Sequence, residues 1–268
     1  MAERAATIAE LTLDYSDDEL DAVADLFDRR VFAQRRQRDP DRDERTRRAV
    51  ADAMLRALAA RRALVLEGSP ARPRVRLLEP HATVLDPFVA PEVEVHVVEE
   101  SALGMRAWSL YARGEVVVER RALPGEALSR LTARPRVAAA PVPLPHALFE
   151  ADDAAQPARV EVTLRQFERA DAAVTAGMPP PAGVPKLLGD VLYARTASAT
   201  VILTARSDTG VVEHERWSWL AAGRLGLWRV SVGPGRELST VFIEVVQPQE
   251  FRAELARGLA AIAGALPD

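Results

Sequence analysis

The chain has 268 residues, 48% of them hydrophobic and 28% charged, which is ordinary for one soluble globular domain. It has no cysteine, which excludes disulfides and thiolate metal sites. Its net charge of −4 and the lack of any basic block argue against nucleic-acid binding. No apolar run is long enough for a secretory leader or a membrane span, so a cytoplasmic protein with no membrane partner is expected.

The first part of the chain is predicted to hold one strand followed by helices. ATIAELTLDY (6–15) has the character of a strand, and Ser16 then suits the N-cap of a helix, with Glu19 as its partner in a capping box. The segment 29–48 carries both charge signs and is expected to be a solvated loop or a fraying helix. Apolar spacings of three and four predict a second helix over 43–62, after which prolines break the chain into short pieces.

Strands dominate from residue 91 onward. Alternating valines and short turns predict a three-stranded antiparallel meander over 92–123, with the turn SALG at 101–104. PGEALSRL (124–131) is predicted to begin a helix, because proline suits the first helical turn. The segment 132–158 is rich in proline and is interpreted as an extended connector.

The second part of the chain repeats the order of strand and then helix at 159–174. A rigid proline-rich loop is expected at 178–190, followed by strand-like segments as far as residue 247 and a closing helix from Pro248.

An internal repeat links the two parts. WSLYARGEVVVER (108–120) aligns with WSWLAAGRLGLWR (217–229), which matches Trp108 to Trp217, Gly114 to Gly223 and Arg120 to Arg229. We infer an α+β fold in which two pseudo-twofold related α/β halves build one mixed, largely antiparallel sheet with flanking helices. The predicted division is a first half-unit at 1–135, a connector at 136–158 and a second half-unit at 159–268, all in one domain.

The tryptophans separate into shared and unshared positions in this repeat. Trp108 and Trp217 hold equivalent positions and are interpreted as framework residues. Trp217 and Trp219 are expected to share one face of the sheet, because side chains alternate along a strand. Trp219 and Trp228 have no counterpart in the first half, so they are candidates either for core packing or for a partner surface.

No motif carries catalytic chemistry. The histidines at 81, 96, 146 and 214 do not pair at metal-ligand spacing, and solvated strand faces explain His96 and His214. VGPGREL (232–238) lacks the lysine and hydroxyl residue of a phosphate-binding loop. The sequence therefore predicts no catalytic residue, no metal site and no cofactor, and enzymatic activity is not expected.

The layout resembles the EspG family, the cytosolic chaperones of mycobacterial type VII (ESX) secretion. The resemblance rests on the order and spacing of segments in both halves. Those segments are LTLDYSDDELDAVADLF, RRAVADAMLRALAARRALVLEG, VRLLEPHATVLDPFVAPEVEVHVV, ALPGEALSRLTARPRVAAAPVPLP and ERWSWLAAGRLGLWRV with VFIEVVQPQEFRAELARGL.

The resemblance implies a chaperone that binds the helical tip of a secreted PE/PPE- or WxG-type client and keeps the client soluble before export. Such a role needs an exposed apolar surface. The expected contact residues are Trp217, Trp219, Trp228 and Phe242, together with Ser101 and Leu103 from the turn between two early strands.

Two alternatives stay open at this point. One is a small-ligand-binding protein or an enzyme with a site between the two halves, which requires a deep pocket with convergent polar groups. The other is a homodimer formed through an edge of the sheet, which requires a mass in solution that depends on concentration.

Overall fold

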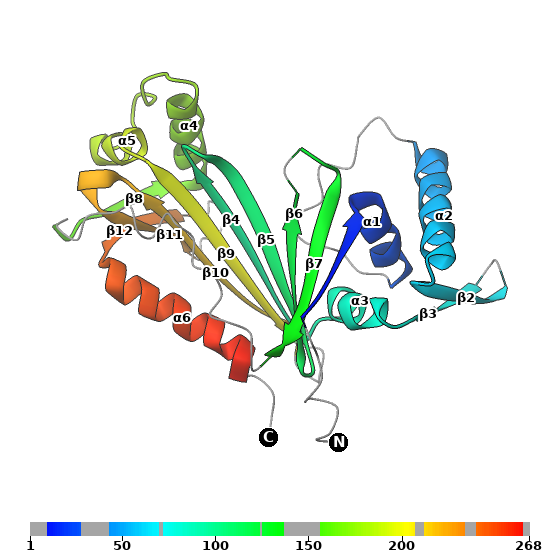
Figure 1. The fold of residues 1–268 in the computed structure, drawn as a ribbon. Coiled ribbons are helices and arrows are strands. Elements are labelled where there is room, and N and C mark those ends of the chain that lie inside the picture. Colours follow the sequence, from blue (N-terminus) through cyan, green and yellow to red (C-terminus); the bar gives the residue numbers. More distant parts are fainter. Residues whose placement is uncertain are drawn as a thin grey trace.

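The computed structural model describes residues 10–27, 43–69, 72–123, 125–136, 156–206, 212–233 and 240–264. Within them the chain forms a mixed α+β fold, in which helices flank one ten-stranded antiparallel sheet and a small two-stranded hairpin (Figure 1). No helix in these ranges combines the length and the hydropathy that crossing a bilayer requires.

The described elements divide into a first part, up to residue 136, and a second part, from residue 156. The first part contains β1 (Leu11–Ser16), α1 (Asp17–Leu26), α2 (Glu44–Ala60), β2 (Leu64–Ser69), β3 (Arg72–Leu77), α3 (His81–Val89), β4 (Val93–Ser101), β5 (Gly104–Arg113), β6 (Val116–Ala122) and β7 (Leu128–Pro135). The second part contains β8 (Arg159–Thr163), α4 (Leu164–Thr175), α5 (Lys186–Tyr193), β9 (Ala197–Arg206), β10 (Val212–Ala221), a short 3-10 turn (Gly223–Leu225), β11 (Leu227–Gly233), β12 (Thr240–Val246) and α6 (Pro248–Gly264).

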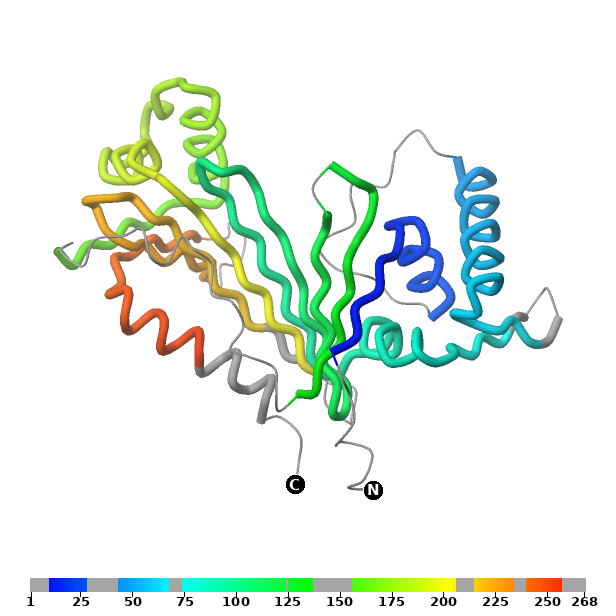
Figure 2. Tube along the Cα trace, viewed as in Figure 1, coloured from blue at the N-terminus to red at the C-terminus, as the bar shows by residue number. Residues whose placement is uncertain are grey.

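The large sheet has the strand order β1-β7-β6-β5-β4-β9-β10-β11-β12-β8. Its centre is the antiparallel pair of β4 and β9, in which Val97 lies opposite Val201. Each part of the chain thus contributes five adjacent strands, and the first strand of each part, β1 or β8, lies at an outer edge. In the view of Figure 2 the strands fan out, with β4 and β5 beside β9 on one side and β6, β7 and β1 on the other.

Several sequence predictions are confirmed. Ser16 caps α1 in a capping box with Glu19, and the second helix covers Glu44–Ala60. The predicted meander is formed by β4, β5 and β6, and its first turn joins Ser101 to Gly104.

The helix predicted at 124–131 is wrong, because residues 128–131 belong to strand β7. Gly125 has a φ of 77°, and the backbone N–H of Leu123 donates to the carbonyl oxygen of Leu128 at 2.9 Å, which closes a turn from β6 to β7. Beyond the turn, buried Leu131 and Ala133 alternate with polar residues, and this period of two fits a strand.

The proline-rich segments also hold more regular structure than predicted. Residues 81–89 form α3 directly after Pro80, and residues 186–193 form α5 directly after Pro185, in a segment expected to be a rigid loop. Proline has no N–H to donate, and the first residues of a helix do not need one, so a proline at this position is compatible with a helix start. Part of the mixed-charge segment 29–48 lies outside the described residues, and its last residues begin α2.

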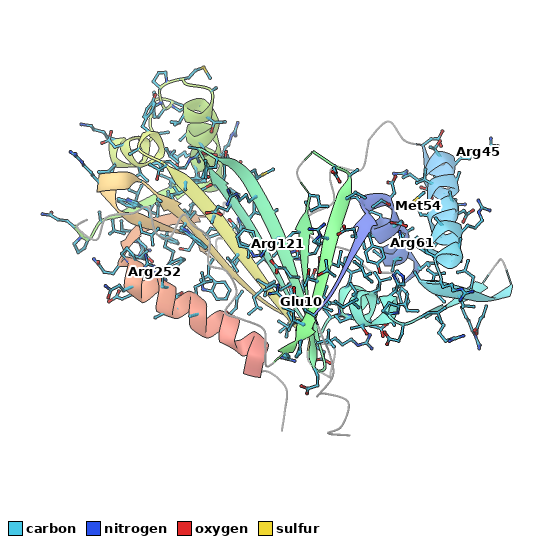
Figure 3. All side chains as sticks on the ribbon, in the orientation of Figure 1. Glu10, Arg45, Met54, Arg61, Arg121 and Arg252 are labelled. Carbon is cyan, nitrogen blue, oxygen red and sulfur yellow. The ribbon has the colours of Figure 1, made fainter. Side chains whose placement is uncertain are left out.

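One face of the sheet is covered by the closing helix. Val95, Val201 and Trp219 lie on this face, and Phe251 and Leu255 of α6 pack into the same buried cluster. On β1, β7 and β6 the same face is polar: Asp14 pairs with Arg130, Arg134 pairs with Glu10, and Arg121 pairs with Glu119 (Figure 3 labels Arg121 and Glu10).

The opposite face is covered by two separate helical groups. Over the strands of the first part, β1, β7, β6, β5 and β4, the helices α1 and α3 pack Leu20 and Phe88 against Tyr15 and Tyr111. Over the strands of the second part, β9 to β12 and β8, the helices α4 and α5 contribute Ala170, Leu188 and Val191. These side chains pack against Val160, Ile243 and Trp228. The helices therefore leave the middle strands of this face between them (Figure 1).

Candidate functional site

The tryptophans expected to form one aromatic stripe are divided between the two faces of the sheet. Trp217 and Trp219 share a face, as their spacing predicts, whereas Trp228 belongs to the cluster on the opposite face. Trp219 and Trp228 are 1% and 2% exposed, and Trp217 is buried as well. The expected exposed stripe is therefore wrong, because the folded chain offers a partner almost none of these three rings.

The unshared tryptophans are held by contacts inside the chain. The Trp219 ring meets the edge of Phe251 from α6, with ring centroids 5.0 Å apart. The Trp228 indole Nε1–H donates to the carbonyl oxygen of Leu225 at 2.8 Å. Both contacts are typical of framework tryptophans, whose size fills a core. The indole N–H of Trp228 has an acceptor, whereas the buried Nε1 of Trp219 has none among the described residues.

Phe242, also expected in the stripe, lies in a different environment. It is half-buried on β12, and the Arg159 guanidinium of β8 lies 4.4 Å from its ring centroid. A Cβ added to Gly233 would fall well inside van der Waals contact of the same ring. The phenyl ring is thus enclosed between β8 and β11.

The turn between β4 and β5 exposes apolar side chains. Leu103 is 80% exposed and Met105 is 77% exposed, and both are next to Ser101, whose hydroxyl accepts the backbone N–H of Leu103 at 3.2 Å. The left-handed φ of Gly104, 101°, allows the two-residue turn. Ser101 and Leu103 were expected from the sequence, whereas Met105 was missed because it lies inside the predicted strand.

Two more exposed apolar side chains lie on the α4–α5 segment. Met178 and Tyr193 are each 53% exposed, and the Tyr193 hydroxyl donates to the carbonyl oxygen of Met178 at 2.9 Å. Tyr193 ends α5 just before β9, whose first residue, Ala197, lies opposite Ser101. The chain path therefore brings α5 to the end of the sheet that carries the β4–β5 turn (Figure 1).

We name Leu103, Met105, Met178 and Tyr193 the tip surface. They are half of the eight large apolar side chains that are exposed among the described residues. Single exposed apolar residues are common on any protein, but a group at one end of the molecule is typical of a contact site.

A buried polar group lies on the central strands. The His96 Nε2 lies 2.5 Å from Oε1 of Glu94, and the His96 Nδ1 lies 2.8 Å from the hydroxyl of Ser109 on β5. All three side chains are buried. The interpretation of His96 as a residue on a solvated face is therefore wrong, because its side chain is 2% exposed and its ring meets that of Tyr111 edge-on, with centroids 6.1 Å apart.

Serine, histidine and carboxylate in line suggest a nucleophile with its base, but the surroundings differ from those of a hydrolase. Ser109 is fully buried, and its strand pairs on both sides, with His96 on β4 and Arg120 on β6. The backbone around Ser109 is therefore engaged in ladder hydrogen bonds and unsuited to stabilising an oxyanion. The geometry is that of a satisfied hydrogen-bond network, which fixes the contact between β4 and β5.

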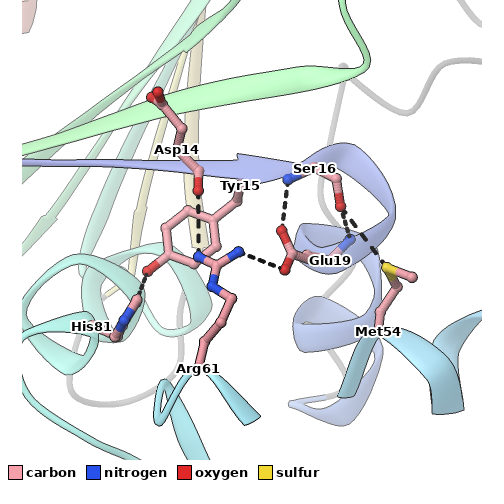
Figure 4. Close-up of polar contacts among 7 residues, drawn as sticks. All are labelled: Asp14, Tyr15, Ser16, Glu19, Met54, Arg61 and His81. Carbon is pink, nitrogen blue, oxygen red and sulfur yellow. Dashed lines mark hydrogen bonds and ion pairs between the residues drawn. The ribbon is translucent and has the colours of Figure 1, made fainter. Parts of the chain in front are cut away.

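A second polar group joins β1 to the neighbouring helices (Figure 4). The Tyr15 hydroxyl lies 2.6 Å from Nδ1 of His81, and the Arg61 guanidinium lies over the Tyr15 ring and contacts Glu19 at 2.8 Å. Burial raises the pKa of Tyr15 above its ordinary value. Burial, and then the charge of Arg61, lower the pKa of His81 below 6.5. Both side chains are thus held neutral at pH 7, which suits a structural link.

The described residues include no group of three or more His, Asp and Glu side chains placed to hold a metal ion. His146 and the side chain of His214 lie outside the part that the structure describes. Neither a protein-family model nor a curated protein matches the sequence.

Proposed function

We propose that the chain is a binding protein of the EspG type, which holds the helical tip of a PE/PPE- or WxG-type secretion client in the cytoplasm and keeps it soluble before export. The observation that carries this proposal is the exposure of Leu103 and Met105, at 80% and 77%, on a turn of the central strands. Exposed apolar anchors at a projecting turn are suited to burial against an amphipathic helical partner.

The tip surface has the composition that such a partner requires. Met105 and Met178 have flexible, polarisable side chains that adapt to irregular apolar surfaces. Tyr193 adds a ring whose hydroxyl is already satisfied by the carbonyl oxygen of Met178. On this proposal the client tip covers the β4–β5 turn and the end of α5 together, and the buried tryptophans support the strands beneath.

The arrangement of strands supports the proposed duplication of two halves within one domain. The order β1-β7-β6-β5-β4 has its mirror in β8-β12-β11-β10-β9, strand for strand. Trp108 and Trp217 lie on the corresponding strands β5 and β10, and Gly114 and Gly223 follow with nearly equal φ values of 53° and 51°. We infer half-units at 1–135 and 159–268, joined by the connector at 136–158.

One detail of the proposed repeat needs a different alignment. Leu110 of β5 lies opposite Glu119, whereas Trp219 of β10 lies opposite Arg229. Arg229 therefore corresponds to Glu119 and not to Arg120, because the turn after β10 contains one more residue.

Co-purification with a defined client tests the function. The PE–PPE and WxG-type proteins of the source organism are co-expressed with the tagged chain, and we expect one of them to be retained. The variant Leu103→Glu/Met105→Glu should reduce retention at least about tenfold without lowering the melting temperature, because both side chains are exposed.

The matched control is Leu66→Glu on β2, which changes another exposed leucine, 41% exposed, outside the tip surface. This control should retain the client as the wild type does. Failure of the wild type to retain any of these clients, or equal retention by the double variant, would contradict the proposal.

A further inference from the structure

The large sheet ends in two edge strands, β1 and β8, which differ in whether another part of the described chain contacts their outward backbone groups. At β1, Arg61 reaches the edge and its guanidinium lies 3.5 Å from the carbonyl oxygen of Asp14. At β8, within the described residues, the only paired neighbour is β12, and β8 lies at the opposite end of the sheet from β1 (Figure 1). An open edge strand is a template for pairing with another chain.

The direction of the free backbone groups on β8 follows from its pairing with β12. The backbone N–H of Val245 donates to the carbonyl oxygen of Ala158 at 3.0 Å, so Ala158 directs its backbone groups toward β12. Because the direction of the backbone groups alternates along an antiparallel strand, the N–H and C=O groups of Val160 and Val162 also point toward β12. The N–H and C=O groups of Arg159 and Glu161 therefore face the open edge.

The side chains on β8 divide into a buried and a charged face. Val160 and Val162 are 6% and 5% exposed, in the cluster covered by α4 and α5. Arg159 and Glu161 are exposed on the other face. The Arg159 guanidinium lies over the Phe242 ring, and its five N–H donors exceed what one ring contact can occupy, so donors are available for a carboxylate.

We propose that β8 pairs antiparallel with β8 of a second copy of this chain, with the twofold axis at Val160. In this register Arg159 lies opposite Glu161 of the second copy, and Glu161 lies opposite Arg159. Each such pair can exchange two backbone hydrogen bonds, because both residues direct their backbone groups outward. Val160 then meets its own copy on the buried face.

Charge selects this register over its neighbour. A shift of the axis to Glu161 places that carboxylate opposite itself, and like charges directly opposite one another destabilise a strand pair. The backbone sets the length of the pairing, because Pro157 has no N–H and the N–H of Thr163 already donates to Gln166 at 3.0 Å. So short a contact makes a dimer that forms and dissociates with concentration.

Sedimentation velocity over a concentration series tests the proposal. Wild-type protein should pass from monomer to dimer as concentration rises. Glu161→Arg and Arg159→Glu should each weaken dimerisation at least about tenfold, because each replaces two opposite-charge pairs by two like-charge pairs. An equimolar mixture of the two variants should recover the dimer as a heterodimer, because every position then meets the opposite charge.

The control is Glu126→Arg in the turn between β6 and β7, an exposed charge away from β8 that should leave dimerisation unchanged. The mixture also answers the concern that Arg159→Glu disturbs its own contact with Phe242, since a damaged chain would not recover a partner. A wild type that stays monomeric throughout, or a mixture that does not dimerise, would overturn the proposal.

Discussion

Ser16 and Thr163 hold matching positions on the two outer strands of the sheet. Ser16 ends β1 and Thr163 ends β8, and each hydroxyl accepts the backbone N–H of the third helical residue, at 3.1 and 3.2 Å. Glu19 and Gln166 return the contact to the N-cap backbone at 2.8 and 3.0 Å. The two junctions use the same capping box to turn an edge strand into a helix.

Removal of either cap should destabilise the chain by a similar amount. Ser16→Ala and Thr163→Ala should each lower the free energy of unfolding by about 1 kcal/mol, because each leaves an N–H at a helix start without its acceptor. Urea unfolding measures the change, and Ser16→Asp and Thr163→Asp serve as controls that keep an acceptor. A loss confined to one of the two alanine variants would show that the junctions are not equivalent.

The burial of Tyr15 and His81 should give stability a dependence on pH at both ends of the range. The folded chain favours the neutral form of both groups, because the pKa of His81 is lowered and the pKa of Tyr15 is raised. As pH falls below 6.5, the unfolded chain takes up the His81 proton first, and stability decreases. As pH rises above 10.0, the unfolded chain loses the Tyr15 proton first, and stability decreases again.

Substitutions assign the two limbs of this profile. His81→Gln should flatten the acid limb, and Tyr15→Phe should flatten the alkaline limb at a cost of about 1–2 kcal/mol near pH 7 for the lost hydroxyl contact. The measurement is urea unfolding at a series of pH values. Limbs that keep the wild-type slope in these variants would assign the dependence to other groups.

Truncation of the buried tryptophans should destabilise the fold rather than act through a partner. Trp219→Ala and Trp228→Ala should each lower the free energy of unfolding by about 3–5 kcal/mol, because each empties a large volume in a core. Trp219→Phe, which keeps a ring against Phe251, should lose less. Differential scanning calorimetry measures the loss, and an unchanged melting temperature in the alanine variants would place these rings at the surface.

The close approach of Gly233 and Phe242 gives a double-mutant test. Gly233→Ala should lower stability by about 1–3 kcal/mol, because the added methyl group collides with the ring. Phe242→Leu should relieve the collision, so the combined loss should be smaller than the sum of the single losses. Additive losses in thermal unfolding would mean that the two residues do not compete for space.

Local patterns predicted the elements that short-range chemistry determines. The cap at Ser16 and the alternating valines of β4 to β6 were read correctly, because capping and pleating depend on residues a few positions apart. The prediction of a helix at β7 is wrong, because Pro124 suits a helix start as well as a turn. The left-handed φ of Gly125 favours the turn. The helix α5 was missed because the prolines before it suggested a loop.

The candidate site was less accessible to sequence reasoning. Ser101 and Leu103 lie in a turn that the sequence predicts, and their role as contacts stays a prediction. For Trp219 and Trp228 the sequence leaves core packing and a partner surface open, and their burial in the structure agrees with core packing. Burial depends on which helix covers which face of the sheet, and α6 and α5 come from distant parts of the chain. Alternation along a strand assigns the two faces but does not tell which of them is covered.

Hydrogen–deuterium exchange of the chain with and without its helical client tests most directly whether the tip surface is the contact. Binding should slow backbone exchange at the β4–β5 turn, residues 101–105, and at the end of α5 near Tyr193, while β2 and β3 exchange at the same rate in both states. Protection that falls elsewhere and leaves the β4–β5 turn unchanged would contradict the account.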